Sequence, residues 1–169
     1  MTDTLAPTRE ASLIWSDALV LELDFMDDTH REFVDLLASV ETADDADLLI
    51  RFEALIDHTD DHFGREDRWM RETQFSSSNC HTLQHTVVLQ VMREGLKRGQ
   101  EQNDLALVRQ MAKELGVWFP QHAQSMDAAL ALHLRRVGYD EKTGIVLTPD
   151  ALPAGEIHGC GGSCSTDAS

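Results

Sequence analysis

Two histidines and a glutamate recur at intervals of four in the segment DHTDDHFGRED, which spans residues 57–67. In a helix this spacing places His58, His62 and Glu66 on one face, with neighbouring Cβ atoms about 6 Å apart. A face that only packed against other helices would be apolar. This row of imidazole and carboxylate groups therefore indicates a chemical role, although two histidines at this spacing are a weak signal alone.

Residues of the same types recur in three other segments of the chain. They are His30 in DDTH, His81 and His85 in HTLQH, and His122 and Asp127 in HAQSMD. Together with His62 and Glu66 they make a set of five imidazoles and two carboxylates. Burying such groups without partners in one interior would cost several kcal/mol apiece, and a bound metal removes that cost.

The ligand types restrict which metal could bind. The set is too rich in nitrogen for magnesium or calcium, and it is unsuited to copper(I). A zinc ion needs about four ligands, so seven indicate two metal ions that share bridging carboxylates. Iron fits this set best.

Apolar periodicity predicts four helices to position these residues, and no segment reads as a convincing strand. We expect helices at about 27–40, 45–72, 80–98 and 104–137, with the polar run SSSN as a cap before the third and Gly99 as its stop. Every helix carries at least one residue of the set. Short connections favour antiparallel neighbours, so we expect an all-α, up-down-up-down four-helix bundle.

The rest of the chain divides around this bundle. We expect an N-terminal arm at 1–23, in which Leu13, Ile14 and Trp15 could anchor, the bundle at 24–139, and a flexible tail at 140–169 that is rich in Gly, Pro, Ser and Thr. With 169 residues and 42% hydrophobic content, the chain is typical of one globular domain.

The three cysteines are too few and too unevenly placed for a disulfide framework. Cys80 stands alone, whereas Cys160 and Cys164 share the glycine-rich tail. This pair could cycle between dithiol and disulfide or hold a metal in transit, but two inert thiols are the favoured interpretation.

The net charge of −16 excludes two classes of partner. Nucleic acid and anionic membranes both attract Lys and Arg clusters, and this acidic chain would repel them. The N-terminal MTDTLAPTRE lacks the apolar core of a signal peptide, and no later run approaches the roughly 18 apolar residues of a membrane span. We therefore expect a cytoplasmic protein.

Taken together and in order, the segments DDTH, HFGRE, HTLQH and WFPQHAQSMD make residues 13–139 resemble a bacterial hemerythrin. The resemblance implies two non-haem iron ions joined by an oxo or hydroxo bridge, at which dioxygen binds reversibly. It also implies which iron each residue holds: His81, His85 and His122 one iron, His30 and His62 the other, and Glu66 and Asp127 both. Dioxygen would then bind at an open position on the iron held by two histidines.

Some features do not fit neatly. Members often have a glycine eight residues before the first histidine and a glutamine just before it, where this chain has Glu22 and Thr29. His122 and Asp127 are five residues apart, about 140° around an ideal helix, so both face the metals only if the helix forms a π-type turn or bends. Pro120 favours such a distortion because it removes a backbone donor.

Several neighbouring residues are expected outside the ligand set. We interpret His58 as a hydrogen-bonding core or rim histidine rather than a residue acting behind the ligands. His133 and His158 have no ligand partner at a useful spacing and are expected to face solvent. Leu89 and Trp118, each four positions from a ligand, are expected in the core.

The predicted function is reversible dioxygen binding for storage, local supply or scavenging, with a reductase or an oxygen-consuming enzyme as a conceivable partner. The alternatives are a di-iron enzyme that reduces O₂, peroxide or nitric oxide with external electrons, and an oxygen or redox sensor acting through the cysteine-containing tail. The Glu-x-x-His repeats of ferritin-like oxidases are absent. The apolar residues near the ligands predict a dry pocket, which favours a carrier over an enzyme: Phe33, Phe63, Leu89, Trp118 and Met126.

Overall fold

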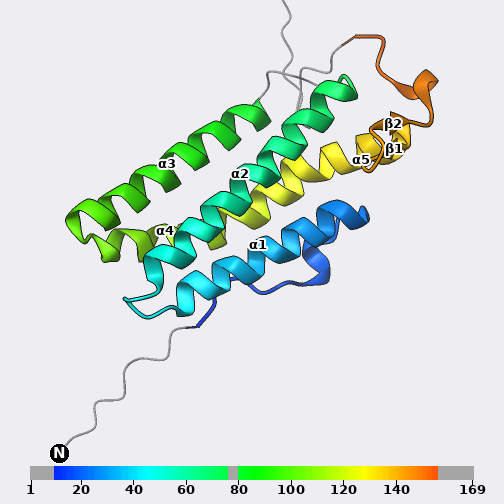
Figure 1. The fold of residues 1–169 in the computed structure, drawn as a ribbon. Coiled ribbons are helices and arrows are strands. Elements are labelled where there is room, and N and C mark those ends of the chain that lie inside the picture. Colours follow the sequence, from blue (N-terminus) through cyan, green and yellow to red (C-terminus); the bar gives the residue numbers. More distant parts are fainter. Residues whose placement is uncertain (1–9, 76–79, 156–169) are drawn as a thin grey trace, which may run out of the picture.

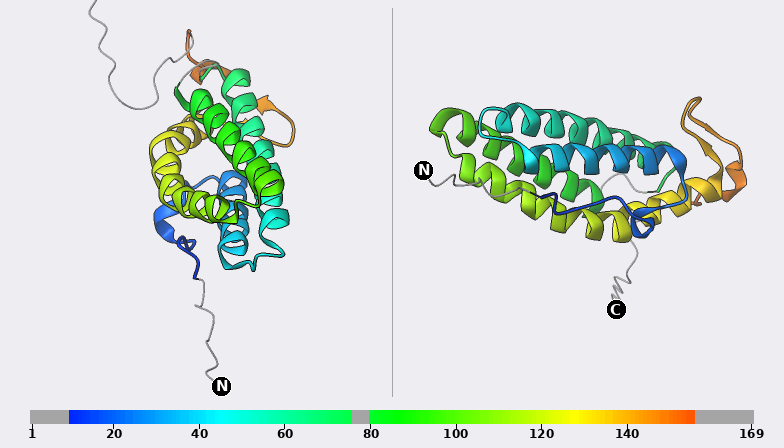
Figure 2. Two further views of the ribbon diagram at one scale, coloured as in Figure 1. Left: turned by 90° about the vertical axis from the view of Figure 1, so that its left-hand side faces the viewer. Right: turned by 90° about the horizontal axis from the view of Figure 1, so that it is seen from below.

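The computed structural model describes residues 10–75 and 80–155, and Figure 1 shows that long helices dominate them. The helices are α1 (Asp24–Thr42), α2 (Leu48–Glu72), α3 (Cys80–Gln102), α4 (Leu105–His122) and α5 (Ala128–Val137). Successive long helices run in opposite directions, so the predicted all-α, antiparallel four-helix bundle is confirmed (Figures 1 and 2). Within the described ranges, the helices are too short or too polar to span a lipid bilayer.

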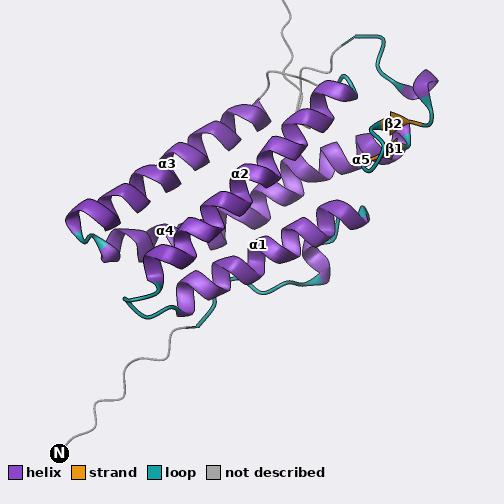
Figure 3. Cartoon of the chain, viewed as in Figure 1, coloured by secondary structure: helices purple, strands orange, loops and turns teal. Residues whose placement is uncertain are grey.

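The fourth predicted helix is continuous but contains a distortion. Helix α4 leads into a five-residue π-helical turn, Ala123–Asp127, and α5 follows directly (Figure 3). The turn adds one residue to the helical repeat.

The predicted end of the third helix at Gly99 is wrong. Helix α3 continues to Gln102, and Asn103, with φ 56°, supplies the left-handed residue that ends it. Gly99 is instead buried against Leu49 and Val108, where an added Cβ would crowd both side chains. The cap predicted in SSSN lies at residues 76–79, outside the described part of the chain.

The N-terminal arm, from residue 10, lies along α1 and α4 and includes the short 3₁₀ helix Asp17–Leu19 (Figure 2). Leu13 and Trp15 pack against the core, and the ring of Trp15 stacks 4.7 Å from the guanidinium of Arg31. Ile14 does not anchor the arm, because successive side chains of an extended segment point to opposite sides and Ile14 is 76% exposed.

Residues 139–155 contain more regular structure than the sequence predicted. Strands β1 (Tyr139–Asp140) and β2 (Ile145–Val146) form an antiparallel hairpin, which a 3₁₀ helix, Pro149–Ala151, follows. Left-handed glycines at Gly138 and Gly144 allow the turns. His158, Cys160 and Cys164 lie outside the described residues.

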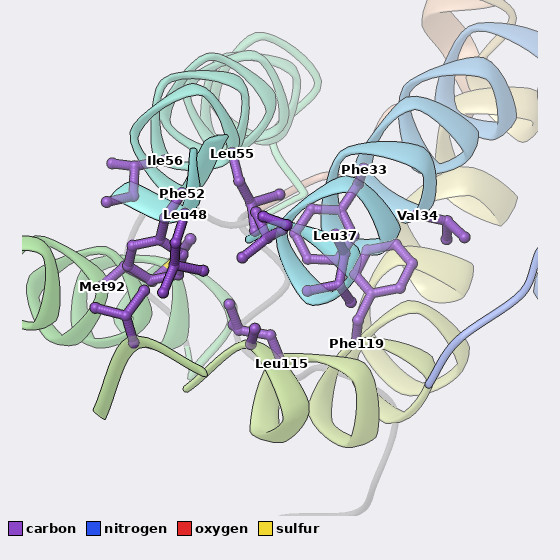
Figure 4. Close-up of a cluster of buried hydrophobic side chains, with 14 of the residues drawn as sticks. Phe33, Val34, Leu37, Leu48, Phe52, Leu55, Ile56, Met92, Leu115 and Phe119 are labelled. Atoms are coloured by element: carbon purple, nitrogen blue, oxygen red, sulfur yellow. The ribbon is translucent and has the colours of Figure 1, made fainter. Parts of the chain in front are cut away.

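Two apolar clusters fill the bundle. The larger one joins α1, α2 and α4 through side chains such as Phe33, Leu55 and Phe119 (Figure 4). The second joins α2 and α5 through Trp69 and Leu134, among others. On α1 and α2 the metal-ligating candidates fall between residues of these two clusters in the sequence, and on α4–α5 Asp127 does so while His122 lies one residue before Ala123, the last member of the larger cluster.

Candidate metal centre

All seven residues predicted to bind metal are buried in the interior of the bundle. Their exposed fractions are 0% for His30, Glu66, His81 and Asp127, 1% for His62 and His85, and 2% for His122. Helix α1 contributes one residue, α2 and α3 contribute two each, and the α4–α5 helix contributes two. The predicted rows therefore face one common volume.

The four-residue spacing on α2 places a histidine and a carboxylate in contact. Nε2 of His62 lies 3.0 Å from Oε1 of Glu66, one helical turn further along. The apolar positions Leu55, Ile56 and Phe63 share the buried side of the helix and orient this row toward the core.

The five-residue spacing on the fourth helix is accommodated by the π-helical turn. Nε2 of His122 lies 3.1 Å from Oδ1 of Asp127, a contact that 140° of rotation around an ideal helix would prevent. The hydroxyl of Ser125 donates a hydrogen bond of 2.6 Å to the carbonyl of Gln121 within this distorted segment. The predicted π-type turn is confirmed, and Pro120 lies in the preceding turn.

The two oxygens of Glu66 face different groups of histidines. Oε2 lies 3.4 Å from Nε2 of His81 and 3.3 Å from Nε2 of His85. Oε1 lies near His62 and 3.9 Å from Nε2 of His30.

The two oxygens of Asp127 also face different groups of histidines. Its Oδ1 lies 2.9 Å from Nε2 of His81 and close to His122, whereas Oδ2 lies 3.3 Å from Nε2 of His30. The potential ligand atoms thus form two clusters, each with members within 4.8 Å of one another: Glu66, His81, His85, His122 and Asp127; and His30, His62, Glu66 and Asp127. Only the two carboxylates belong to both.

Several buried atoms of these seven residues have no hydrogen-bond partner within the described ranges, which indicates whether a metal would fit between them. Buried side-chain atoms with no hydrogen-bond partner in the described residues include Nε2 of His30, His81, His85 and His122, Oε2 of Glu66 and both oxygens of Asp127. Such atoms are costly to bury unless something binds them. Imidazole nitrogens and carboxylate oxygens directed at one interior are a donor set that fits two transition-metal ions.

Both carboxylates are held in the ionised form. Burial alone would raise the pKa of Glu66, but the charge of His62, the hydrogen bond from its ring and the close approach of His30 and His81 bring the pKa well below its usual range. The pKa of Asp127 is also far below its usual range, because His122 and His30 outweigh burial and the charge of Glu66.

The pKa of three imidazoles is raised: those of His30, His81 and His85, the last through the Asp67 and Glu66 carboxylates against burial. Burial lowers the pKa of His30, but the nearby carboxylates of Asp127 and Glu66 favour its charged form and raise the pKa to about 9. The same balance raises the pKa of His81 to about 10. Metal ions that bind these imidazoles must displace the protons that the raised pKa values favour.

Aromatic rings pack against the histidines. Phe63 stacks on His85 with ring centroids 3.9 Å apart, and Trp118 stacks on His122 at 4.5 Å. Phe119 meets His30 edge-on at 5.2 Å. These rings fix the imidazole orientations and keep polar groups away from the centre.

The other histidines differ in how well the sequence predicted them. Nε2 of His58 donates to the carbonyl of Thr29 at 3.2 Å, in line with a hydrogen-bonding rim residue. The prediction that His133 faces solvent is wrong: it is 6% exposed, and its Nε2 donates to the carbonyl of Thr73 at 3.0 Å. His133 lies on the side of α5 that packs onto the end of α2, a rotation that its lack of ligand partners did not reveal.

Two residues beside the ligands were missed. Asp67 lies 2.9 Å from Nδ1 of His85, and the amide oxygen of Gln84 lies 3.3 Å from Nδ1 of His122. The only sequence signal for either was a polar residue next to a ligand, since Asp67 follows Glu66 and Gln84 precedes His85.

Comparisons with known proteins agree with this centre. Residues 21–132 match the family model described as the Hemerythrin HHE cation binding domain. The chain is 37% identical over 128 residues to a bacteriohemerythrin of Ralstonia nicotianae, which covers 76% of this chain and 93% of the relative. It is 30% identical over 117 residues to a bacteriohemerythrin of Aquifex aeolicus, covering 65% of this chain and 88% of the relative. No solved structure matches the chain significantly.

Proposed function

Because the chain belongs to the hemerythrin family, we propose that its seven buried residues hold two non-haem iron ions at which dioxygen binds reversibly. The observation that carries the proposal is the division of each shared carboxylate between two groups of histidines. Glu66 and Asp127 each direct one oxygen toward His81 and the other toward His30. Two metal ions, each with its own imidazoles and joined by both carboxylates, would satisfy this arrangement.

The bound iron would supply the electrons that a reversible carrier shares with dioxygen. The chain's own residues would keep protons and anions away from that process. Phe63 and Trp118 stack on imidazole faces and Phe119 packs edge-on against His30, while Leu89, one turn from His85 on α3, is buried as predicted. Exclusion of water and protons favours release of the gas over its reduction.

The surroundings of two further residues favour a carrier over an enzyme. Among the described residues outside the ligand set, His58 has its ring centroid 6.2 Å from that of His62. Burial lowers its pKa, and the nearby charge of His62 lowers it further, so His58 is a poor proton donor at neutral pH. Cys80, at the first residue of α3, is exposed and gives no support to a route for electrons from this thiol.

Other parts of the proposal stay predictions. They are the oxo or hydroxo bridge between the ions, the assignment of the open position to the iron held by His30 and His62, a reductase as partner, and a cytoplasmic location.

Metal analysis combined with gas exchange tests the proposal. Protein produced with iron available should contain two irons per chain, and the anaerobically reduced protein should gain a visible band in air that disappears under argon and returns with oxygen. His62→Ala and His85→Ala should each lose at least one iron. His58→Gln, four residues from His62 on the same helix, is the matched control and should keep both. One zinc and no iron would contradict the proposal, and irreversible bleaching in air would favour the enzyme.

A further inference from the structure

The two groups of histidines differ in how their outer nitrogens are bound. On the side of His81, His85 and His122, Nδ1 of His85 lies 2.9 Å from the Asp67 carboxylate, and Nδ1 of His122 lies 3.3 Å from the Gln84 amide oxygen. Both partners are acceptors, so each Nδ1 carries the proton that it donates. This fixes the tautomer in which the Nε2 lone pair faces the metal.

The other side has no such support in the described part of the chain. Nδ1 of His30 and Nδ1 of His62 are buried without a hydrogen-bond partner there. Nδ1 of His81 also lacks one, so two of three outer nitrogens are paired on the first side and neither of two on the second. The tautomers of His30 and His62 are therefore not fixed from outside.

The imidazoles of His85 and His122 are also held in place by aromatic stacking. The rings of Phe63 and His85 are nearly parallel, with an interplanar angle of 7°, and those of Trp118 and His122 meet at 26°. His30, by contrast, meets Phe119 edge-on at 84°. A ligand that is already oriented loses less entropy when a metal binds.

We propose that Asp67 and Gln84 are positioning residues that make the three-histidine side the tighter metal site, so that the iron held by His30 and His62 is the first to leave. This inference rests on the proposed function. A carboxylate that accepts a hydrogen bond from an imidazole makes that imidazole a stronger metal ligand. Loss of such a partner typically lowers metal affinity about 10- to 100-fold. Asp67 contributes more than Gln84, because its hydrogen bond is shorter and its charge attracts the cation.

Iron release to a chelator tests the order of loss. Reduced protein containing two irons is mixed anaerobically with excess bipyridine, and the coloured ferrous complex is followed with time. The unaltered protein should release its irons in two phases of equal amplitude. Asp67→Ala should accelerate the slow phase by about 10- to 100-fold and leave the fast phase unchanged. Asp67→Asn keeps an acceptor oxygen but no charge, so the rate of its slow phase should lie between those of the unaltered protein and Asp67→Ala.

Asp60→Asn is the control for the loss of one negative charge. Asp60 is on the same helix, where it forms an exposed ion pair of 2.8 Å with Arg93, and its replacement should leave both phases unchanged. A single phase in the unaltered protein would overturn the inference, as would equal acceleration of both phases by Asp67→Ala, which would indicate a general loosening. Fewer than two irons before the chelator is added would instead contradict the proposed function.

Discussion

The hydroxyl of Ser12 lies directly against Gly116, where the N-terminal arm crosses helix α4. A Cβ atom at this glycine would overlap Ser12 and approach Leu37. The arm is also held here by a hydrogen bond of 2.7 Å from the Ser12 amide to Glu41 of α1. The close approach of arm and helix therefore depends on the missing side chain.

Gly116→Ala should lower the free energy of unfolding by about 1–3 kcal/mol, because the new methyl group displaces the arm. Gly64→Ala provides the contrast: no atom lies within 4 Å of that position, so the better helix propensity of alanine should raise stability by about 1 kcal/mol. Urea unfolding of the iron-loaded proteins measures both. Ser12→Gly in the Gly116→Ala background should restore part of the loss, and no restoration would contradict this explanation.

Glu22 adopts the left-handed conformation, with φ 57°, at the position where the resemblance led us to expect glycine. Its side chain is 83% exposed and forms an ion pair of 3.1 Å with Arg135, which contributes little. Glu22→Gly should therefore be about 1 kcal/mol more stable than Glu22→Ala, since both lose the ion pair but only glycine relieves the backbone. Thermal unfolding of the two variants decides it, and equal midpoints would show that the turn is unstrained.

His133 should make the stability of the protein depend on pH. Burial lowers the folded-state pKa of His133 below 6.5. The hydrogen bond to Thr73 raises this pKa in part, and the charge of Arg136 lowers it further. Below pH 6.5 the unfolded chain therefore binds a proton first, so this contribution to stability is complete above pH 6.5 and declines as the pH falls through the folded-state pKa. His133→Gln, which keeps a donor for Thr73, should lose less stability between pH 7.5 and pH 5 than the unaltered protein. Parallel pH profiles would exclude His133 as the source.

Trp118 separates the histidines from a pocket of about 380 Å³ between α3 and α4. Val87 and Val91, which line this pocket, are 48% and 55% exposed, so solvent reaches it. Trp118→Ala should let water reach His122 and shorten the lifetime of the oxygen-dependent visible band severalfold without loss of iron. Trp118→Phe keeps a ring on His122 and should change the lifetime less. An unchanged lifetime in Trp118→Ala would show that other side chains exclude the water.

The sequence predicted the parts of this protein that depend on spacing within one helix. The four-residue rows on α2 and α3 required one buried face each, and the five-residue step from His122 to Asp127 required a π-helical turn. Contacts between helices were not predictable in this way. Asp67 reaches His85 only because α2 and α3 are rotated to bring them together, and His133 is buried by a similar rotation of α5.

The end of α3 shows a different reason for failure. Glycine is the common stop signal, but the tight packing of Gly99 against Leu49 outweighed that preference, and Asn103 ends the helix instead. The hairpin at 139–146 was missed because two-residue strands carry too few residues to show alternation.

The ligands lie between two apolar clusters that do not merge, one containing Phe33 and Phe119 and the other Trp69 and Leu134. Each cluster can keep its own packing when the polar layer between them loosens, so the layer determines whether they open together. Metal ions that bind residues from all the long helices tie the clusters into one cooperative unit. Without metal ions, backbone amides around Trp69 and Leu134 should exchange hydrogen independently of those around Phe33 and Phe119. Because such local opening exposes the chain to proteases, the iron supply would determine how well this chain resists proteolysis.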